Sequence, residues 1–391
     1  MRILFNTPFK PLDHPRLSGD VTIARDLMDY LKDHGHEVQT SPFVPCTWIF
    51  WKPWLWPRLV RTRRRAWHKA QRFGAEIVLT YHSYYKAPDL IGPYLKSRGL
   101  RYGLFSGAYA AKRAKTWKTL PGYLLNKRAL LAADHIFSNK PSDHGALHGL
   151  VPEERRTFVG QGVPLERFGF FPRARAVLRR EWLGEAAAEQ RPVLVTAAVL
   201  RPGVKVDGVE WVIRCVAELV RLGLDPLLVV AGDGPGRERL EALAAEIAPG
   251  RVRFLGLVPR DDLKAVFSAG DVFAFPGIHE GLGMVYLEAQ ACGLPVVATT
   301  HAGAKDVIRH EKTGYLVPPF DMPSFAAACF RLMRDRELCR LMGQDAVRFV
   351  RREHDIQRNY FVMESLLQAL AERGADASNT ASVMQGESAH P

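Results

Sequence analysis

Two carboxylates, Glu280 and Glu288, lie eight residues apart around a Gly-Leu-Gly turn. An apolar run over 271–275 predicts a strand that ends just before the turn, and a helix is expected to begin near Gly283. The first backbone N–H groups of a helix have no partner within it, so they suit a phosphate group. Glu280 is expected at the carboxyl edge of that strand, where open α/β sheets bind ligands.

Glu288 falls in the middle of the expected helix, among Ala289, Ala291 and Cys292. Its charge therefore needs a hydrogen-bonding partner if the helix is buried. The alternative is a helix cap followed by one solvated glutamate, with no chemical role.

The segment 275–298 resembles the E-x7-E signature of retaining glycosyltransferases with the GT-B fold, in particular glycosyltransferase family 4. The resemblance is strong over 191–319 and looser in the first half of the chain. It implies that Glu280 and the backbone of the following turn hold a sugar and its diphosphate, and that Glu288 accepts hydrogen bonds from ribose hydroxyls. The turn residues are Gly281, Leu282, Gly283 and Met284.

Two cations, Arg201 and Lys205, follow the first strand expected in the second half of the chain. The family has an Arg and, five residues on, a Lys-Gly at this point. Here the spacing is four, and two residues separate Lys205 from Gly208. The resemblance implies that both cations stabilise a departing nucleoside diphosphate without a metal. The alternative is two solvated loop cations.

The segment 232–236, Gly-Asp-Gly-Pro-Gly, follows an expected strand and precedes a helix. It lacks the G-x-G-x-x-G spacing of a dinucleotide fingerprint, and no acidic residue ends a second strand at the required distance. It resembles the G-D-G-P turn of the family. We predict a packing role at the wall of a cleft.

In the first half, Ser18, Gly19 and Asp20 precede the first long helix, expected over 20–34. The family has Gly-Gly here, so that the backbone can approach the donor phosphates or the acceptor. The resemblance therefore implies a donor-binding role for Gly19. Asp20 is equally suited to cap the helix N-terminus.

A histidine of the first domain often lines the acceptor side in this family, and His82, just past the expected strand 77–81, is the candidate catalytic residue. His279, beside Glu280, is a second candidate. Several relatives work without a histidine base because the leaving phosphate takes the acceptor proton.

Short apolar runs alternate with helical stretches, which predicts parallel sheets covered by helices. By the resemblance, the fold is α/β and GT-B: two doubly wound, Rossmann-like domains facing across a cleft. The expected strands are 2–6, 37–40, 77–81, 101–105, 135–138 and 157–160, then 193–199, 227–231, 252–255, 272–275 and 296–298.

The expected domain organisation follows the same division. It comprises an N-terminal acceptor-binding domain over 1–168, a linker over 169–190, a C-terminal nucleotide-sugar-binding domain over 191–343, a helix over 344–372 that crosses back, and a disordered tail over 373–391.

The composition, 47% hydrophobic and 24% charged, is that of an ordinary soluble globular protein. No apolar run reaches the roughly 18 residues of a spanning helix, and no signal peptide is visible. We therefore expect a cytoplasmic location, with peripheral attachment to the inner face of the plasma membrane left open.

The five cysteines lack metal-binding spacing, so we expect neither a metal nor a cofactor. The net charge of +13 suits anionic lipid or a phosphorylated substrate, and without a nucleic-acid motif we do not expect nucleic acid as a partner.

The most unusual local composition spans 48–67, which holds five tryptophans together with Arg61, Arg63, Arg64 and Arg65. Tryptophan favours the membrane interface, and Lys and Arg favour anionic headgroups. The prolines at 53 and 57 predict a loop plus a helix rather than one continuous helix. The alternatives are a Trp-rich lid over the acceptor site and ordinary core with a basic helix face.

The resemblance implies a retaining hexosyltransferase that moves a sugar from a nucleoside-diphosphate-sugar to a hydroxyl of a glycan or lipid-linked acceptor. A role in cell-envelope or exopolysaccharide synthesis is expected. The alternative is a catalytically silent membrane- or glycan-binding relative of the same fold. The intact pair of Glu280 and Glu288 favours the enzyme.

Overall fold

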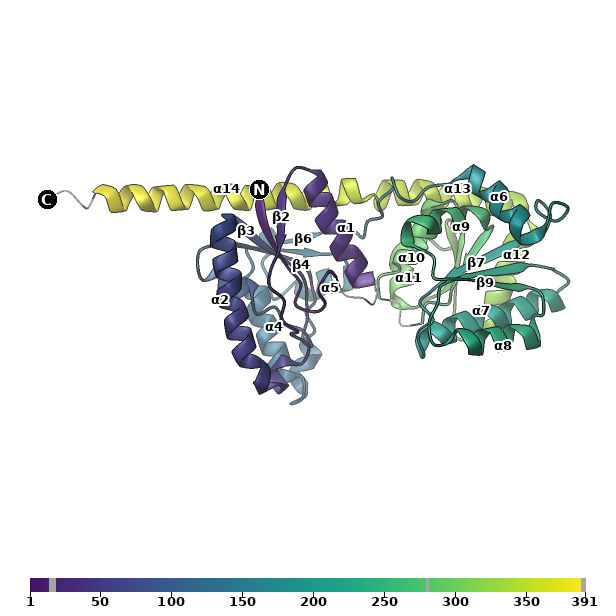
Figure 1. Cartoon of the computed structure of the whole chain (residues 1–391), viewed down its shortest axis with the longest axis horizontal. Coiled ribbons are helices and arrows are strands. Elements are labelled where there is room, and N and C mark those ends of the chain that lie inside the picture. Colours follow the sequence, from purple (N-terminus) through teal and green to yellow (C-terminus); the bar gives the residue numbers. More distant parts are fainter. Residues whose placement is uncertain (14–18, 279–280, 388–391) are drawn as a thin grey trace. The chain divides into compact units, whose positions relative to one another are not determined.

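The chain folds into two compact units, drawn in Figure 1. The computed structural model describes residues 1–13, 19–278 and 281–387, without the side chains of 302 and 374–387. The first unit is Met1–Gln161 with Ile356–Pro391, and the second is Gly162–Asp355. The sequence placed the start of the second domain at 191 and the return of the chain at 344. The structure instead divides the chain after residues 161 and 355.

The first unit is built on a six-stranded parallel sheet with the order β2-β1-β3-β4-β5-β6. Its strands are β1 (Arg2–Asn6), β2 (Glu37–Thr40), β3 (Ile77–Ser83), β4 (Arg101–Gly107), β5 (His135–Ser138) and β6 (Arg156–Phe158). The chain proceeds from β1 outward to β2 in one direction and from β3 outward in the other. The switch point of this sheet therefore lies between β1 and β3.

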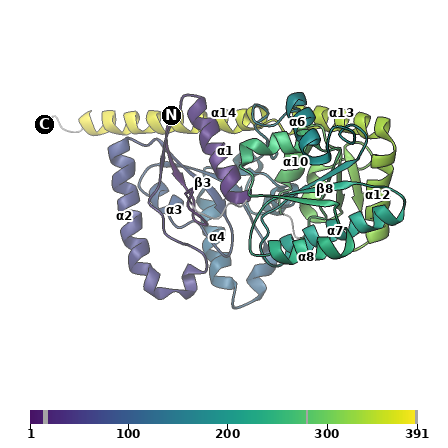
Figure 2. The same ribbon diagram turned by 45° about the vertical axis from the view of Figure 1, so that its right-hand side comes forward.

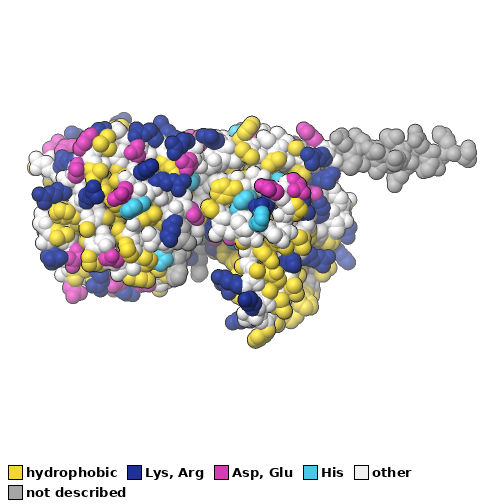
Figure 3. Space-filling view, turned by 180° about the vertical axis from the view of Figure 1, so that it is seen from behind, with side chains coloured by type: hydrophobic (Ala, Val, Ile, Leu, Met, Phe, Trp, Pro, Cys, Tyr) yellow, Lys and Arg dark blue, Asp and Glu magenta, His cyan; other side chains and the backbone are white. Residues whose placement is uncertain are grey.

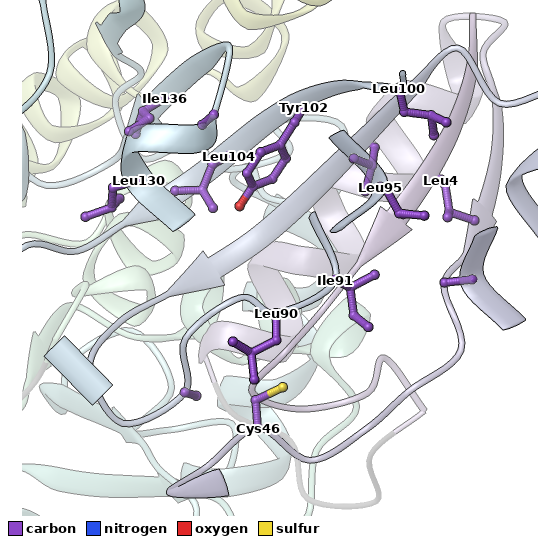
Figure 4. Close-up of a cluster of buried hydrophobic side chains, with 14 of the residues drawn as sticks. Leu4, Cys46, Leu90, Ile91, Leu95, Leu100, Tyr102, Leu104, Leu130 and Ile136 are labelled. Atoms are coloured by element: carbon purple, nitrogen blue, oxygen red, sulfur yellow. The ribbon is translucent and has the colours of Figure 1, made fainter. Parts of the chain in front are cut away.

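Helices cover both faces of the first sheet. They are α1 (Gly19–Asp33), α2 (Trp56–Phe73), α3 (Gly92–Lys96), α4 (Leu120–Ala132), α5 (Pro141–Leu147) and α14 (Ile356–Glu387), with short 3-10 turns η1 (Ile49–Trp51), η2 (Pro53–Leu55), η3 (Ala111–Lys115) and η4 (Glu153–Arg155). The α2–α4 side buries a hydrophobic core, part of which Figure 4 shows: Tyr102 and Leu104 of β4 lie with Leu95 of α3 and Leu130 of α4.

On the other side of this sheet, α14 packs beside α1 and against β3 and β4. Buried Glu364 of α14 accepts a hydrogen bond from Tyr30 Oη at 2.7 Å and contacts His36 Nε2 at 2.7 Å. These contacts fix the returning helix to the first unit. The sequence assigned 373–391 to a disordered tail, whereas α14 extends to Glu387.

The second unit has its own six-stranded parallel sheet, with the order β12-β11-β10-β7-β8-β9. Its strands are β7 (Val193–Ala197), β8 (Leu227–Ala231), β9 (Val252–Gly256), β10 (Val272–Ala274), β11 (Val296–Thr299) and β12 (Gly314–Val317). Two series of strands run outward from β7 and β10, so the switch point lies between these two strands.

Helices also cover both faces of the second sheet. They are α6 (Pro172–Leu183), α7 (Val204–Arg221), α8 (Arg237–Ile247), α9 (Leu263–Ala269), α10 (Met284–Ala291), α11 (Ala302–Val307), α12 (Met322–Arg334) and α13 (Arg336–Glu353), with the 3-10 turn η5 (Arg260–Asp262). Helix α7 packs against α8 and α12, α6 packs on α9, and α10 packs on α13 (Figures 1 and 2). The segment 169–190, expected to be a linker, thus contains α6 and belongs to the second unit.

Asp271 fastens α6 to this sheet. Its carboxylate accepts from Arg175 Nη2 at 2.6 Å and from Arg179 Nη1 at 3.0 Å, and also from the backbone N–H of Val193 at 2.8 Å. Arg179 is buried and donates to three backbone carbonyls as well. A buried charge with this many partners stabilises the positions of β7 and β10, the two strands at the switch point.

Candidate active site

The loops that leave β7 and β10 lie next to each other at the carboxyl edge of the second sheet, because the two strands pair directly. The loop after β7 carries Arg201 and continues into α7, which begins at Val204. The loop after β10 continues into α10, which begins at Met284. A switch point flanked by two helix N-termini is where open α/β sheets bind phosphorylated ligands.

Lys205 links these two loops. It lies in the first turn of α7, and its Nζ is 5.2 Å from the centre of the Phe275 ring, in the loop after β10. Arg201 is half-buried in the loop just before this helix. Both predicted cations thus lie in the segment that follows β7, and Lys205 contacts the loop after β10; their roles remain predictions.

The backbone of the loop after β10 is anchored from two sides. Tyr286 Oη donates to the carbonyl of Phe275 at 3.2 Å, and Thr299 Oγ1 donates to the carbonyl of Pro276 at 2.5 Å. Thr299 Oγ1 also lies 2.7 Å from His301 Nδ1. His301, from the loop after β11, was not among the residues singled out in the sequence.

Gly283 forms the N-cap of α10 in a left-handed conformation with φ of 70°. A Cβ atom there would lie 2.8 Å from the carbonyl oxygen of Gly303, so the site requires glycine for both conformation and space. Leu282 and Met284 are buried beside it, and Gly281 is exposed. Glu280 and His279 lie outside the described residues, and their roles remain predictions.

Glu288 is buried on α10 and is paired with Arg260, the first residue of η5. Both Nε and Nη2 of Arg260 lie 2.8 Å from Glu288 Oε1. The guanidinium also lies 5.3 Å from the centre of the Phe168 ring. The partner that a buried Glu288 requires is therefore present, and the sequence interpretation missed it because 28 residues separate the two.

The negative charge of Glu288 also affects the thiol of Cys292, four residues further along the chain. Burial, and then the negative charge of Glu288, raise the pKa of the Cys292 thiol to about 12. This thiol is therefore protonated at neutral pH and packs as a small apolar side chain.

The Gly-Asp-Gly-Pro-Gly turn packs against the loop that carries Arg201. A Cβ on Gly232 would lie 1.8 Å from the carbonyl oxygen of Ala198, and one on Gly234 would lie 2.6 Å from that of Leu200. The backbone N–H of Leu200 donates to the carbonyl of Asp233 at 3.0 Å. The turn thus fits the packing role expected from the sequence, since it supports the residues just before Arg201.

His82 lies at the switch point of the first sheet, in the second-last position of β3. The strand thus continues past Tyr81, where the sequence had ended it. His82 and its neighbour on β4, Ser106, both have left-handed backbones, with φ of 65° and 59°. Such strain in two adjacent residues is found mainly at functional sites.

The His82 ring is held on several sides. Its Nδ1 lies 3.2 Å from Ser106 Oγ, and its ring centre lies 4.8 Å from that of Tyr84 and 5.9 Å from that of Phe9. Burial lowers the pKa of His82, and this outweighs the opposite effect of the Asp20 carboxylate. The imidazole is therefore neutral at neutral pH, the form that accepts a proton.

Gly19 begins α1 and is exposed, and a Cβ placed on it would have no atom within 4 Å. The described residues around Gly19 would therefore leave room for a larger side chain at this position. Asp20 lies inside the first turn of α1 rather than at the N-cap, so the capping role expected from the sequence was wrong. Ser18 lies outside the described residues.

A profile of the family described as "Glycosyl transferases group 1" matches residues 191–335. The chain is 37% identical over 191 residues to a GDP-mannose-dependent alpha-(1-6)-phosphatidylinositol monomannoside mannosyltransferase from Mycolicibacterium smegmatis. That match covers 46% of this chain and 48% of the relative, so the chain spans about half the length of the curated relatives that it matches.

Solved structures match nearly the whole chain. Sucrose-phosphate synthase from Thermosynechococcus elongatus superimposes with a TM-score of 0.72 at 20% identity, covering 95% of this chain and 99% of that one. HepE from Anabaena, solved in complex with UDP, superimposes with a TM-score of 0.70 at 18% identity, covering 94% of this chain and 100% of that one. The chain has the GT-B fold, and the match to group 1 glycosyltransferases is confined to residues 191–335.

The fold predicted from the sequence is thus confirmed, and residues 191–335 are similar to the predicted family. The catalytically silent alternative is not favoured. Among the described residues, no helix is long and apolar enough to cross a membrane. Within the same residues, no group of three or more His, Cys, Asp or Glu side chains is arranged to hold a metal ion.

Proposed function

We propose that this chain transfers a sugar from a nucleoside-diphosphate-sugar to a hydroxyl group of a glycan or lipid-linked acceptor, with retention of the anomeric configuration. The observation that carries the proposal is the contact of Lys205 with Phe275 across the switch point, where the loop that carries Arg201 lies beside the loop that leads to α10. Fixed cations and helix N–H groups at such a point suit a diphosphate.

In this reaction the bond between the anomeric carbon and the phosphate oxygen breaks, and a bond from that carbon to the acceptor oxygen forms. The proton of the acceptor hydroxyl passes to the departing phosphate or to a nearby base. Arg201 and Lys205 stabilise the charge that grows on the diphosphate, an effect that is stronger in the transition state than in the bound donor. Glu280 and the turn from Gly281 to Met284 hold the donor sugar.

The first unit takes the acceptor in this proposal. His82 is neutral at neutral pH, is fixed by Ser106 and two aromatic rings, and lies at the carboxyl edge of its sheet. It therefore has the properties of a hydrogen-bond acceptor for a sugar hydroxyl.

The similarity to a GDP-mannose-dependent mannosyltransferase that acts on a phosphatidylinositol mannoside makes GDP-mannose the first donor to test and a lipid-linked glycan the first acceptor. A place in cell-envelope or exopolysaccharide synthesis follows from the same similarity and belongs to the proposal.

The test is to measure nucleoside-diphosphate release from a panel of GDP- and UDP-sugars, with and without lipid-linked acceptors, using the whole chain. Release from one donor is expected, slowed on the order of 100-fold by Arg201→Ala, and NMR of the product should show the anomeric configuration of the donor. If no donor releases a diphosphate while nucleotides still bind, the proposal of catalysis fails. An inverted product would overturn only the retaining mechanism.

A further inference from the structure

Two segments of the first unit that are far apart in sequence meet at the end where α2 and α4 begin. Trp51 Nε1 donates to the carbonyl of Lys118 at 3.0 Å, and the ring centres of Trp51 and Trp117 lie 5.6 Å apart at 78°. Gly122 of α4 packs so closely on this corner that a Cβ would lie 2.4 Å from the Phe50 ring. The segments 48–65 and 111–124 are therefore one structural feature.

This corner exposes large apolar side chains although it stands on a packed core. Trp54 is 70% exposed and Trp117 is 75% exposed. Ile49 and Leu59 of the same segment are buried in the hydrophobic core, so the corner stands on packed side chains. Figure 3 shows hydrophobic side chains gathered at the lower end of this unit, with Lys and Arg beside them. The exposed large apolar residues of these two segments are Trp51, Trp54, Trp56, Val60, Trp117, Leu120 and Leu124.

The charge of the chain is concentrated in the same two regions. The segments 41–75 and 108–133 contain 14 Lys and Arg and no Asp or Glu. The rest of the chain holds the other 40 Lys and Arg against all 41 Asp and Glu, so it is almost neutral. These two regions therefore account for the whole net charge of +13.

Basic side chains lie beside this apolar region on the surface (Figure 3). Helix α2 turns Leu59, Thr62, Ala66 and Ala70 inward and leaves its arginines on the solvent side. Arg63 is the exception, because its Nε donates to the carbonyl of Leu90 at 2.8 Å. The exposed basic residues of the segments 48–65 and 111–124 are Arg58, Arg61, Arg64, Arg65, Lys112, Lys115 and Lys118.

We propose that these exposed apolar and basic residues form one face that docks on an anionic lipid bilayer. Tryptophans occupy the polar–apolar boundary of a membrane, and each Lys or Arg near an anionic surface adds to the attraction. A bilayer can contact both kinds of residue at the same time, because its interior is apolar and its headgroups are anionic. A nucleic acid duplex would use the charge through its phosphates but would leave the exposed Val and Leu side chains without apolar contact. The proposal is independent of the transfer reaction.

The experiment uses the whole chain and sedimentation with vesicles that contain phosphatidylglycerol, compared with vesicles of pure phosphatidylcholine. Three variants are compared with the wild type: Arg61→Ser/Arg64→Ser/Arg65→Ser, Trp54→Ser/Trp117→Ser, and a control with the same charge change, Lys312→Ser/Arg334→Ser/Arg351→Ser. The control residues are exposed and lie in the second unit. Circular dichroism of each variant verifies the fold.

The wild type is expected to sediment only with anionic vesicles, and binding should disappear in 1 M salt, where the Debye length is about 3 Å. The arginine variant should bind roughly 100-fold more weakly. The tryptophan variant should also lose binding, and the control should keep it. Wild-type tryptophan fluorescence should shift to shorter wavelength on binding. If the control variant lost as much vesicle binding as the arginine variant, the attraction would be a general effect of net charge, and the assignment of this face as the docking site would be wrong. Absence of wild-type binding would overturn the proposal, as would tight binding to an oligonucleotide that the tryptophan variant retains.

Discussion

The two switch points of this molecule have the same architecture and different chemistry. In the second unit, Arg201 and Lys205 follow β7, Lys205 contacts Phe275 after β10, and the chain then leads to the start of α10. In the first unit, the strands β3 and β4 instead place His82 and Ser106 side by side, with aromatic rings around them. The second unit thus offers cations and backbone N–H groups, and the first offers a neutral imidazole.

This difference shows that the sheet provides only the position and that the loop residues decide what is bound. Cations suit a diphosphate, whereas a neutral imidazole among aromatic rings suits a sugar hydroxyl. If the comparison is right, changes at the two switch points should affect donor and acceptor separately.

The largest effect is expected for Glu288→Ala, which leaves the Arg260 guanidinium without its main partner. Breaking a buried ion pair from one side costs on the order of 3 kcal/mol, so the free energy of unfolding should fall by about that amount in urea titrations. The exposed pair of Glu337 and Arg340 is the control, and Glu337→Ala should cost less than about 0.5 kcal/mol.

Replacing both partners, as Glu288→Leu/Arg260→Met, should restore most of the stability. A stable double variant that no longer binds nucleotide would assign Glu288 to the ribose as well as to the ion pair. Unchanged nucleotide affinity would limit Glu288 to a structural role.

Removal of the switch-point cations should lower turnover while leaving the fold intact. For Arg201→Ala and Lys205→Ala we expect a loss on the order of 100-fold in kcat, because each stabilises the leaving diphosphate. A large loss in Arg201→Ala with normal kinetics in Lys205→Ala would place the second cation elsewhere.

A smaller effect, roughly tenfold in kcat/KM for the acceptor, is expected for His82→Gln, because the leaving phosphate can also take the proton. Burial lowers the pKa of His82, so the wild type should keep its activity as the pH falls through 6.5. The rate should decline only at lower pH, where the imidazole becomes protonated, and the variant should lack this decline. If His82→Gln changed the KM for the donor as much as the KM for the acceptor, the assignment of donor and acceptor to different units would be wrong.

The smallest effect on stability is expected for Gly19→Ala. The added methyl group meets no atom within 4 Å, so the unfolding free energy should stay within about 0.5 kcal/mol of the wild type. If a donor or acceptor approaches this backbone, turnover should nevertheless fall several-fold. Normal turnover would remove Gly19 from the site.

The sequence predicts the regular parts of the fold well. Strands such as Arg2–Asn6 and Leu227–Ala231 are bounded as expected, because each is a short apolar run between polar or glycine-rich turns. The expected strand ends at Tyr81 and Phe105 were two residues short, since the left-handed backbones of His82 and Ser106 have no signal in the pattern. The edge strand β12 was not expected, because four residues that begin with glycine carry little periodicity.

The site was only partly predictable. The glycine turn and the two cations are local features that the sequence displays directly. The pairing of Arg260 with Glu288, and the contact of Lys205 with Phe275, join residues that lie close only after the sheet has formed. Long-range pairs of this kind cannot be read from spacing in a single sequence.

The central claim is that the switch point of the second unit binds the diphosphate of the donor. Its most direct test is calorimetric titration of GDP and UDP into the whole wild-type chain, Arg201→Ala and Arg221→Ala. Arg221 is exposed at the far end of α7 and pairs with Glu218, so it is a matched control. The account predicts that one nucleotide binds the wild type and the control equally and Arg201→Ala at least about tenfold more weakly. Equal affinity of all three proteins would contradict it.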